Sequence, residues 1–83
     1  MDAYEPVLSA RALAALLSFS KKKQKELSDS LYRLASTPSQ PGDYCFPDES
    51  DRKVQYMLIG NYVIGYWPDH AMKELRIVEI DQV

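Results

Sequence analysis

Hydrophobic residues recur at helical spacing between residues 9 and 36. Two leucine series stand there, at i, i+3, i+4 and at i, i+4, i+7: Leu13, Leu16 and Leu17, then Leu27, Leu31 and Leu34. Each series is the apolar stripe of an amphipathic helix. The two stripes are not in one continuous phase, and Ser18-Phe19-Ser20 lies between them. We therefore expect two helices, with one kinked helix as the alternative.

Serines, a proline and a glycine mark the ends of these helices. Ser9 is expected to cap the first helix, because its hydroxyl can accept a hydrogen bond from an unpaired backbone N–H. Ser18 or Ser20 could cap the second helix. Pro38 disfavours helical geometry at the residue before it, and Gly42 completes a turn-rich stretch. The helical half is therefore predicted to end there.

The remainder of the chain has the pattern of strands. Four segments alternate in polarity or are rich in β-branched and aromatic residues: residues 44–46, 54–59, 62–67 and 75–80. Gly60-Asn61 suits a type II′ hairpin turn, because Gly adopts a positive φ without steric cost. Residues 68–73 are expected to form a longer connection. Residues 4–8 are predicted to add a short strand, with Pro6 tolerated only at an edge or a bulge.

The predicted order is β-α-α-β-β-β-β, which indicates an α+β fold. Two N-terminal helices are expected on one face of a small, mainly antiparallel sheet. The length of 83 residues predicts a single domain, residues 1–83. Alternation in the sheet predicts that Tyr62 and Tyr66 share one face and that Trp67 lies on the other. The aromatic set away from the helices could stack nucleobases, contact a protein or simply pack across strands.

The charge of the chain narrows the function classes. Ten basic and twelve acidic residues give a net charge of −2, with a pI of about 5.2. Small nucleic-acid binders are typically strongly basic, because their affinity depends on phosphate neutralisation. No apolar run approaches membrane-spanning length and no signal peptide is evident, so a soluble, cytoplasmic protein is expected, without contact to a membrane.

The composition gives few candidates for catalysis. A single cysteine and a single histidine exclude an internal disulfide and argue against a Cys/His zinc site, and we expect no metal or cofactor. Cys45 lies in an apolar strand pattern and is expected to be buried, and His70 is expected to be an exposed loop residue. No phosphate-binding, zinc-protease or nucleophile-elbow motif occurs in the sequence.

Charged residues are unevenly distributed along the chain. The second helix carries five of the ten basic residues: Lys21, Lys22, Lys23, Lys25 and Arg33. The segment 43–51 carries four acidic residues and no basic one. The lysines suit a contact surface for phosphate or an acidic partner, or a solvated helix face opposite the leucines. The acidic segment lacks the spacing of a calcium-binding loop and is expected to be a solvated turn.

The element order and three short motifs resemble the RelE/ParE toxin superfamily of type II toxin–antitoxin modules. The segments that carry the resemblance are Leu31-Tyr32-Arg33-Leu34-Ala35-Ser36-Thr37-Pro38, Arg52-Lys53-Val54 with Ile59-Gly60-Asn61-Tyr62-Val63-Ile64-Gly65-Tyr66, and Leu75-Arg76-Ile77-Val78-Glu79-Ile80. Together they cover nearly the whole chain. The resemblance implies a toxin component that inhibits growth and is neutralised by a cognate antitoxin.

The resemblance leaves two mechanisms open. Ribonucleases of the family cut mRNA on the ribosome with basic residues and a tyrosine or histidine, but this sequence has Val63 after the hairpin tyrosine and Asp81-Gln82-Val83 after the last strand, where many members have arginine. If the chain is nonetheless a ribonuclease, the candidate catalytic residues are Lys53, Tyr66 and Arg76. The ParE-like branch, which binds DNA gyrase, lacks the same catalytic set.

These departures favour a component that acts mainly by protein binding and is not an enzyme. The residues expected to contact a partner are Lys21, Lys22, Lys25, Arg52 and Lys53. The expected partner is an antitoxin, with DNA gyrase or the ribosome and its mRNA as alternative targets. A non-toxic interaction module of the same fold is a further alternative, and an exposed edge strand leaves a homodimer open.

Overall fold

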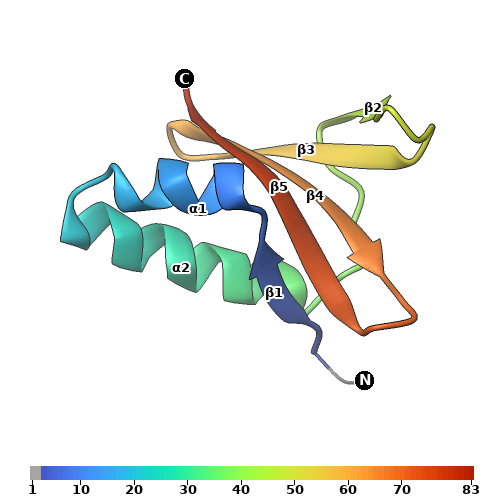
Figure 1. Ribbon diagram of the computed structural model, residues 1–83. Helices are drawn as coiled ribbons and strands as arrows, with labels where there is room; N and C mark the ends of the chain where they lie inside the picture. The colour runs from blue at the N-terminus through green and yellow to red at the C-terminus, as the bar shows by residue number, and fades with distance from the viewer. Residues whose placement is uncertain (1–2) are drawn as a thin grey trace.

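A computed structural model describes residues 3–83 and shows two helices packed on one face of a five-stranded sheet (Figure 1). The elements, in chain order, are β1 (Glu5–Leu8), α1 (Ala10–Leu17), α2 (Lys21–Ala35), β2 (Tyr44–Pro47), β3 (Lys53–Ile59), β4 (Tyr62–Asp69) and β5 (Glu74–Gln82). The strand order is β1-β5-β4-β3-β2. Only the β1–β5 pair is parallel among the described strands. The predicted α+β class and element order are confirmed.

Serine caps divide the helical half into two helices. The Ser9 hydroxyl accepts a hydrogen bond from the Ala12 N–H at 3.1 Å, as expected for the start of α1. Ser20, rather than Ser18, caps α2 by accepting from the Lys23 N–H at 3.3 Å. The Gln24 side-chain amide donates to the Phe19 carbonyl at 2.8 Å and ties the connection to α2. The prediction of two helices is therefore confirmed.

The main core lies between the helices and the central strands. Its buried members are Ala12, Leu27, Leu31, Leu34, Ala35, Ile64, Tyr66, Leu75, Ile77 and Ile80. The α2 leucine series forms the helical side of this core, as its spacing predicts. In Figure 1, α1 and α2 lie beside β1, β5 and β4. The strand β2 and the part of β3 that pairs with it project beyond the helices. Part of the sheet is therefore not covered by a helix.

Strand register divides the sheet into a covered face, toward the helices, and an open face. The covered face carries Gln55, Met57, Ile59, Tyr62, Ile64, Tyr66, Leu75, Ile77 and Ile80. The open face carries Tyr44, Phe46, Val54, Tyr56, Leu58, Val63, Gly65, Trp67, Asp69, Glu74, Arg76, Glu79 and Asp81. The predicted separation of Tyr62 and Tyr66 from Trp67 is thus confirmed.

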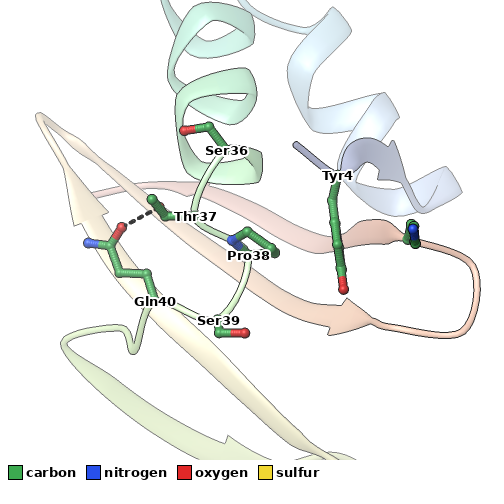
Figure 2. Close-up of a pocket in the computed structure, with 7 residues that line it drawn as sticks. Tyr4, Ser36, Thr37, Pro38, Ser39 and Gln40 are labelled. Atoms are coloured by element: carbon green, nitrogen blue, oxygen red, sulfur yellow. Dashed lines mark hydrogen bonds between the residues drawn. The ribbon is translucent and has the colours of Figure 1, made fainter. Parts of the chain in front are cut away.

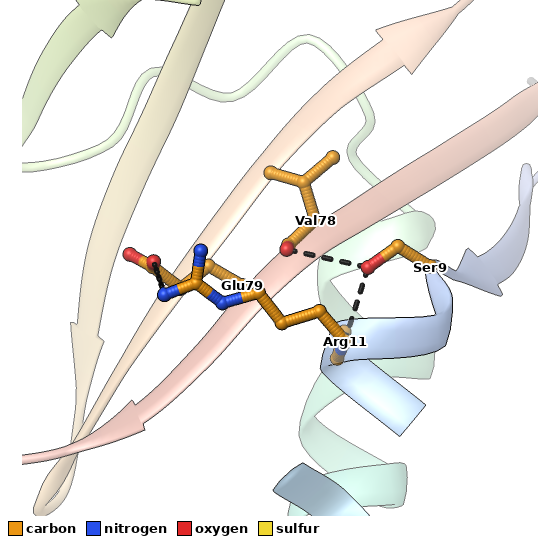
Figure 3. A network of polar contacts seen from close by, with 5 residues as sticks. Ser9, Arg11, Val78 and Glu79 are labelled. Atoms are coloured by element: carbon orange, nitrogen blue, oxygen red, sulfur yellow. Dashed lines mark hydrogen bonds and ion pairs between the residues drawn. The ribbon is translucent and has the colours of Figure 1, made fainter. Parts of the chain in front are cut away.

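A β-bulge in β5 shifts the register beside α1. Gly65 pairs with Glu79 but Tyr66 pairs with Ile77, so Val78 is the extra residue. The Val78 carbonyl accepts a hydrogen bond from the Ser9 hydroxyl at 3.3 Å, and Arg11 of α1 reaches Glu79 at 3.2 Å (Figure 3). The bulge therefore lies where the start of α1 is joined to the sheet.

Three turn and strand predictions have different outcomes. Gly60 has a φ of 59° between the paired residues of the β3–β4 hairpin, as the predicted turn requires. The expected connection at 68–73 is shorter, because Pro68 and Asp69 still pair with β5. Cys45 is exposed, so the prediction of a buried thiol is wrong: β2 is an edge strand and the helices do not cover it.

Candidate functional site

A groove runs between α2 and β3, where the helix does not fully cover the sheet. Two hollows of about 330 and 380 Å³ both contact Ser30 and Ile59 and therefore lie side by side. We call this the α2–β3 groove. Its lining residues are Lys23, Glu26, Leu27, Ser30, Arg33, Leu34, Ser36, Thr37, Gln40, Met57, Ile59, Gly60, Asn61 and Tyr62.

The floor of the α2–β3 groove is apolar and its rim is mostly basic. Leu27 and Leu34 come from the helix stripe, and Met57 and Ile59 come from the covered face of β3. Lys23 and Arg33 supply positive charge to the helix rim, together with one carboxylate, Glu26. An apolar groove with a charged rim is suited to an amphipathic protein segment.

The residues predicted to bind a partner fall into two groups. Lys21, Lys22 and Lys25 are exposed in the first turns of α2, next to Lys23 on the groove rim, and Lys25 pairs with Asp29 at 3.3 Å. Arg52 and Lys53 lie at the β2–β3 connection. Figure 1 places these two regions at opposite ends of the molecule. The five residues therefore do not form one continuous surface.

Arg52 is held by local contacts on the open face. Its guanidinium is 3.5 Å from the Asp48 carboxylate, and its Cζ lies 3.9 Å from the centre of the Trp67 ring. Asp48 also accepts hydrogen bonds from the Ser50 and Arg52 N–H groups, at 2.8 and 2.9 Å. Arg52 thus combines an ion pair and a cation–π contact that organise the tight β2–β3 connection.

Tyr66, the candidate acid or base, is buried in the core. Its hydroxyl donates a hydrogen bond to the Gln40 carbonyl at 2.9 Å. Burial raises the pKa of Tyr66, and the nearby Asp43 carboxylate raises it further. The hydroxyl is therefore held in its neutral form and occupied by a backbone contact, an arrangement suited to tethering the loop after α2.

Lys53 and Arg76, the candidate electrostatic residues, lie on different faces of the sheet. Lys53 shares a face with Gln55, which pairs with the buried Tyr66, whereas Arg76 pairs with Trp67 on the open face. The Arg76 guanidinium is 3.0 Å from Glu74 and 3.5 Å from Asp69. The fold therefore does not bring the three candidate catalytic groups together, and two carboxylates compensate the arginine.

A separate hollow of about 390 Å³ lies between the end of α2 and Tyr4 (Figure 2). Its polar groups are engaged locally: Thr37 Oγ1 donates to Gln40 Oε1 at 2.8 Å, and the Ser36 hydroxyl donates to the Arg33 carbonyl. The Tyr4 hydroxyl is 2.7 Å from His70 Nδ1. His70 is exposed, as predicted, and its described contact is with a tyrosine at the molecular surface.

The part of the chain that the structure describes offers no candidate cluster for a metal ion. Within residues 3–83, no group of three or more His, Cys, Asp or Glu side chains is placed to hold an ion. Over the same residues, neither helix is long and apolar enough to cross a membrane.

The α2–β3 groove contains residues that the sequence pattern did not single out. Met57 and Ile59 were expected only as members of an alternating strand, and Arg33 only as part of a charged helix face. The available signal was limited to the apolar residues Met57 and Ile59 on one face of a predicted strand. Locating the gap between them requires the orientation of α2 on the sheet.

Comparison with known proteins identifies structural neighbours only. No family model and no curated protein sequence matches the chain. The crystal structure of the toxin–antitoxin complex RelBE2 from Mycobacterium tuberculosis contains a similar chain, with a TM-score of 0.82 and 17% identity, over 100% of this chain and 94% of that one. The isolated E. coli RelE toxin gives a TM-score of 0.75 and 14% identity, over 98% and 85%.

An archaeal structure extends the similarity. A chain of the RelE–RelB complex from Pyrococcus horikoshii OT3 has a TM-score of 0.70 and 17% identity, over 98% of this chain and 96% of that one. These similarities span most of each chain. Because the sequence identities are low, the similarities establish a shared fold and nothing more. The chain described here has the fold of the RelE toxins.

Proposed function

We propose that the chain is the toxin-like component of a type II toxin–antitoxin module, and that it acts mainly by binding protein. Two observations support this together: the RelE-like fold and the exposed apolar groove between α2 and β3. Of the similar structures named above, one is a toxin–antitoxin complex and another is a RelE–RelB complex. A cognate antitoxin is therefore the partner that we assign to the groove.

The chemistry of the α2–β3 groove specifies the antitoxin segment. The half-buried Met57 and Ile59 offer apolar surface, so the segment should insert apolar side chains between helix and sheet. The rim and the adjoining first turn of α2 carry lysines, so acidic side chains should flank the apolar ones. Lys21, Lys22 and Lys25 belong to this surface in the proposal.

The positions of the candidate catalytic residues argue against the alternative of an mRNA endoribonuclease. Cleavage without a metal requires basic groups arranged around one phosphate. Lys53 and Arg76 lie on opposite faces, and Arg76 is paired with two carboxylates. Arg52 and Lys53 are accordingly proposed as contacts for a protein target of the toxin, not as groups that act on RNA.

Co-expression tests this function. The chain is induced alone and together with the small reading frame adjacent to its gene. We expect growth inhibition by the chain alone, relief by the neighbour, and a complex of the two proteins that survives purification. Normal growth at high levels of folded protein would remove the support for a toxin.

A charge placed in the groove tests the assigned surface. Ile59→Asp puts a carboxylate on the apolar floor and should weaken the complex about tenfold or more, the effect of losing a central contact. Leu17→Asp is the matched control, because Leu17 is an exposed leucine on α1 and does not line the groove. Thermal unfolding of both variants confirms that each is folded. Equal weakening by the two variants would contradict the assignment to the groove.

A further inference from the structure

The open face of the sheet carries a cluster of aromatic side chains outside the main core. Tyr44 and Tyr56 stack with ring centres 5.3 Å apart and planes 9° apart, and Phe46 meets both rings edge-on. Tyr44, Phe46 and the neighbouring Leu58 are 42, 59 and 52% exposed. We call these four residues, Tyr44, Phe46, Tyr56 and Leu58, the aromatic platform.

A glycine supports the centre of the aromatic platform. Gly65 pairs with Tyr56 across the strands, and a Cβ at Gly65 would lie 2.9 Å from a carbon of the Tyr56 ring. The ring therefore rests directly on the glycine backbone, and a side chain there would displace it. This contact restricts the positions that the ring can adopt, which reduces the entropy lost when a partner binds.

Carboxylates are frequent on the same side of the sheet as the aromatic platform. The open face of β4 and β5 contributes four, and the β2–β3 connection beside it contributes three more: Asp69, Glu74, Glu79 and Asp81, then Asp48, Glu49 and Asp51. The Glu79 and Asp48 charges raise the pKa of Tyr56, after the larger effect of burial, which places both carboxylates within electrostatic range of the ring.

The arginines that reach this side of the sheet are already compensated. Arg11 pairs with Glu79, Arg52 with Asp48, and Arg76 with Asp69 and Glu74. Among residues 3–83, by contrast, three carboxylates form no ion pair with a basic side chain: Glu49, Asp51 and Asp81. The open face therefore has a negative excess, whereas α2 is basic.

We propose that the open face is a second protein-docking surface, which takes a cationic segment of a partner protein with arginine side chains beside apolar ones. The inference goes beyond the proposed function, because it concerns the face opposite the α2–β3 groove. A guanidinium would lie on a tyrosine ring within reach of the carboxylates, as Arg52 already lies on Trp67.

Charge decides between protein and nucleic acid as the occupant. Stacked aromatic residues can also bind unpaired bases, but such sites add a basic groove that follows the phosphates. Here carboxylates outnumber the arginines, which are already paired, and the excess negative charge repels phosphates and attracts guanidinium groups. A hollow of about 180 Å³ beside Trp67, lined also by Val7 and Val78, can receive an apolar side chain of the same segment.

Titration of the full chain with short probes tests this surface. The probes are a peptide of repeating arginine, leucine and glycine, the same peptide with glutamate in place of arginine, and an oligouridylate. Trp67 fluorescence and backbone amide shifts report binding, since Trp67 is the only tryptophan. We expect the arginine peptide to bind, to shift amides of β2, β3 and β4, and to weaken with salt. Binding of the oligouridylate in preference to the arginine peptide would overturn the proposal.

Matched variants locate the binding site. Phe46→Ala should weaken the arginine peptide about two- to fivefold, whereas Leu17→Ala, at an equally exposed apolar residue on α1, should not. The doubly neutralised variant Glu49→Gln, Asp51→Asn should also weaken it about two- to fivefold at low salt.

A charge control on the opposite side completes the test. Glu26→Gln with Asp29→Asn removes the same charge from α2 and should leave peptide affinity unchanged. Equal weakening by the platform variants and their controls would show nonspecific attraction to the whole chain and would overturn the proposal.

Discussion

Tyr66→Phe separates a structural role of the tyrosine hydroxyl from a catalytic one. The substitution keeps the buried ring and removes one hydrogen bond, from the hydroxyl to the Gln40 carbonyl at 2.9 Å. Gln40 is exposed, so water can replace the lost donor at its carbonyl. We therefore expect a loss of about 1 kcal/mol in the free energy of unfolding, the typical net value of such a bond. For a domain of this size the melting temperature falls by roughly 4–8 °C.

Thermal unfolding and growth inhibition are measured on the same Tyr66→Phe variant. Tyr62→Phe is the control, because it also deletes a tyrosine hydroxyl. The ring of Tyr62 is half-buried against Phe19, and the substituted phenylalanine ring would keep that contact. We expect growth inhibition to persist in both variants at equal levels of folded protein. If Tyr66→Phe abolished inhibition while its melting temperature and abundance stayed close to wild type, the hydroxyl would be catalytic and this reasoning would be refuted.

Three further predictions concern stability. Leu31→Ala opens a cavity in the main core and should cost about 2–5 kcal/mol in denaturant unfolding, so a loss under 1 kcal/mol would contradict the assigned core. Gly65→Ala should cost about 1–3 kcal/mol and shift the Tyr56 ring resonances, because the new methyl group meets that ring; unchanged resonances would refute the contact. Burial raises the pKa of Tyr66 in the folded state above its value in the unfolded state. The contribution of Tyr66 to stability is therefore complete below about pH 10 and is lost as the pH rises through the folded-state pKa. In that range the wild type should lose more stability than Tyr66→Phe, and identical pH profiles of the two proteins would refute the raised pKa.

Local patterns predicted most of the fold. The spacing of the leucines determined two helices, and Ser9 and Gly60 act as the expected cap and turn residue. Cys45 was mispredicted because an apolar strand pattern does not distinguish a central strand from an edge strand. The extra residue at Val78 was not predicted, since a bulge depends on contacts with α1 that are distant in sequence.

The candidate sites depend on placement that sequence alone does not provide. The basic α2 and the acidic segment after it were evident, but only the strand register shows that Glu79 and Asp81 join the acidic side. The lysines of α2 and Arg52 have the same charge, yet the start of α2 and the β2–β3 connection, which contains Arg52, lie far apart once the chain folds (Figure 1). Lys53 and Arg76 were grouped as catalytic candidates by residue type, and alternation in the strands separates them.

Primer extension on mRNA during cell-free translation tests most directly the claim that this RelE-like chain acts by protein binding. The purified chain is added at increasing concentration, and Lys53→Ala with Arg76→Ala serves as the comparison. We expect intact mRNA with the wild type and with the double variant alike. Codon-dependent cleavage by the wild type that disappears in the folded double variant would contradict the claim.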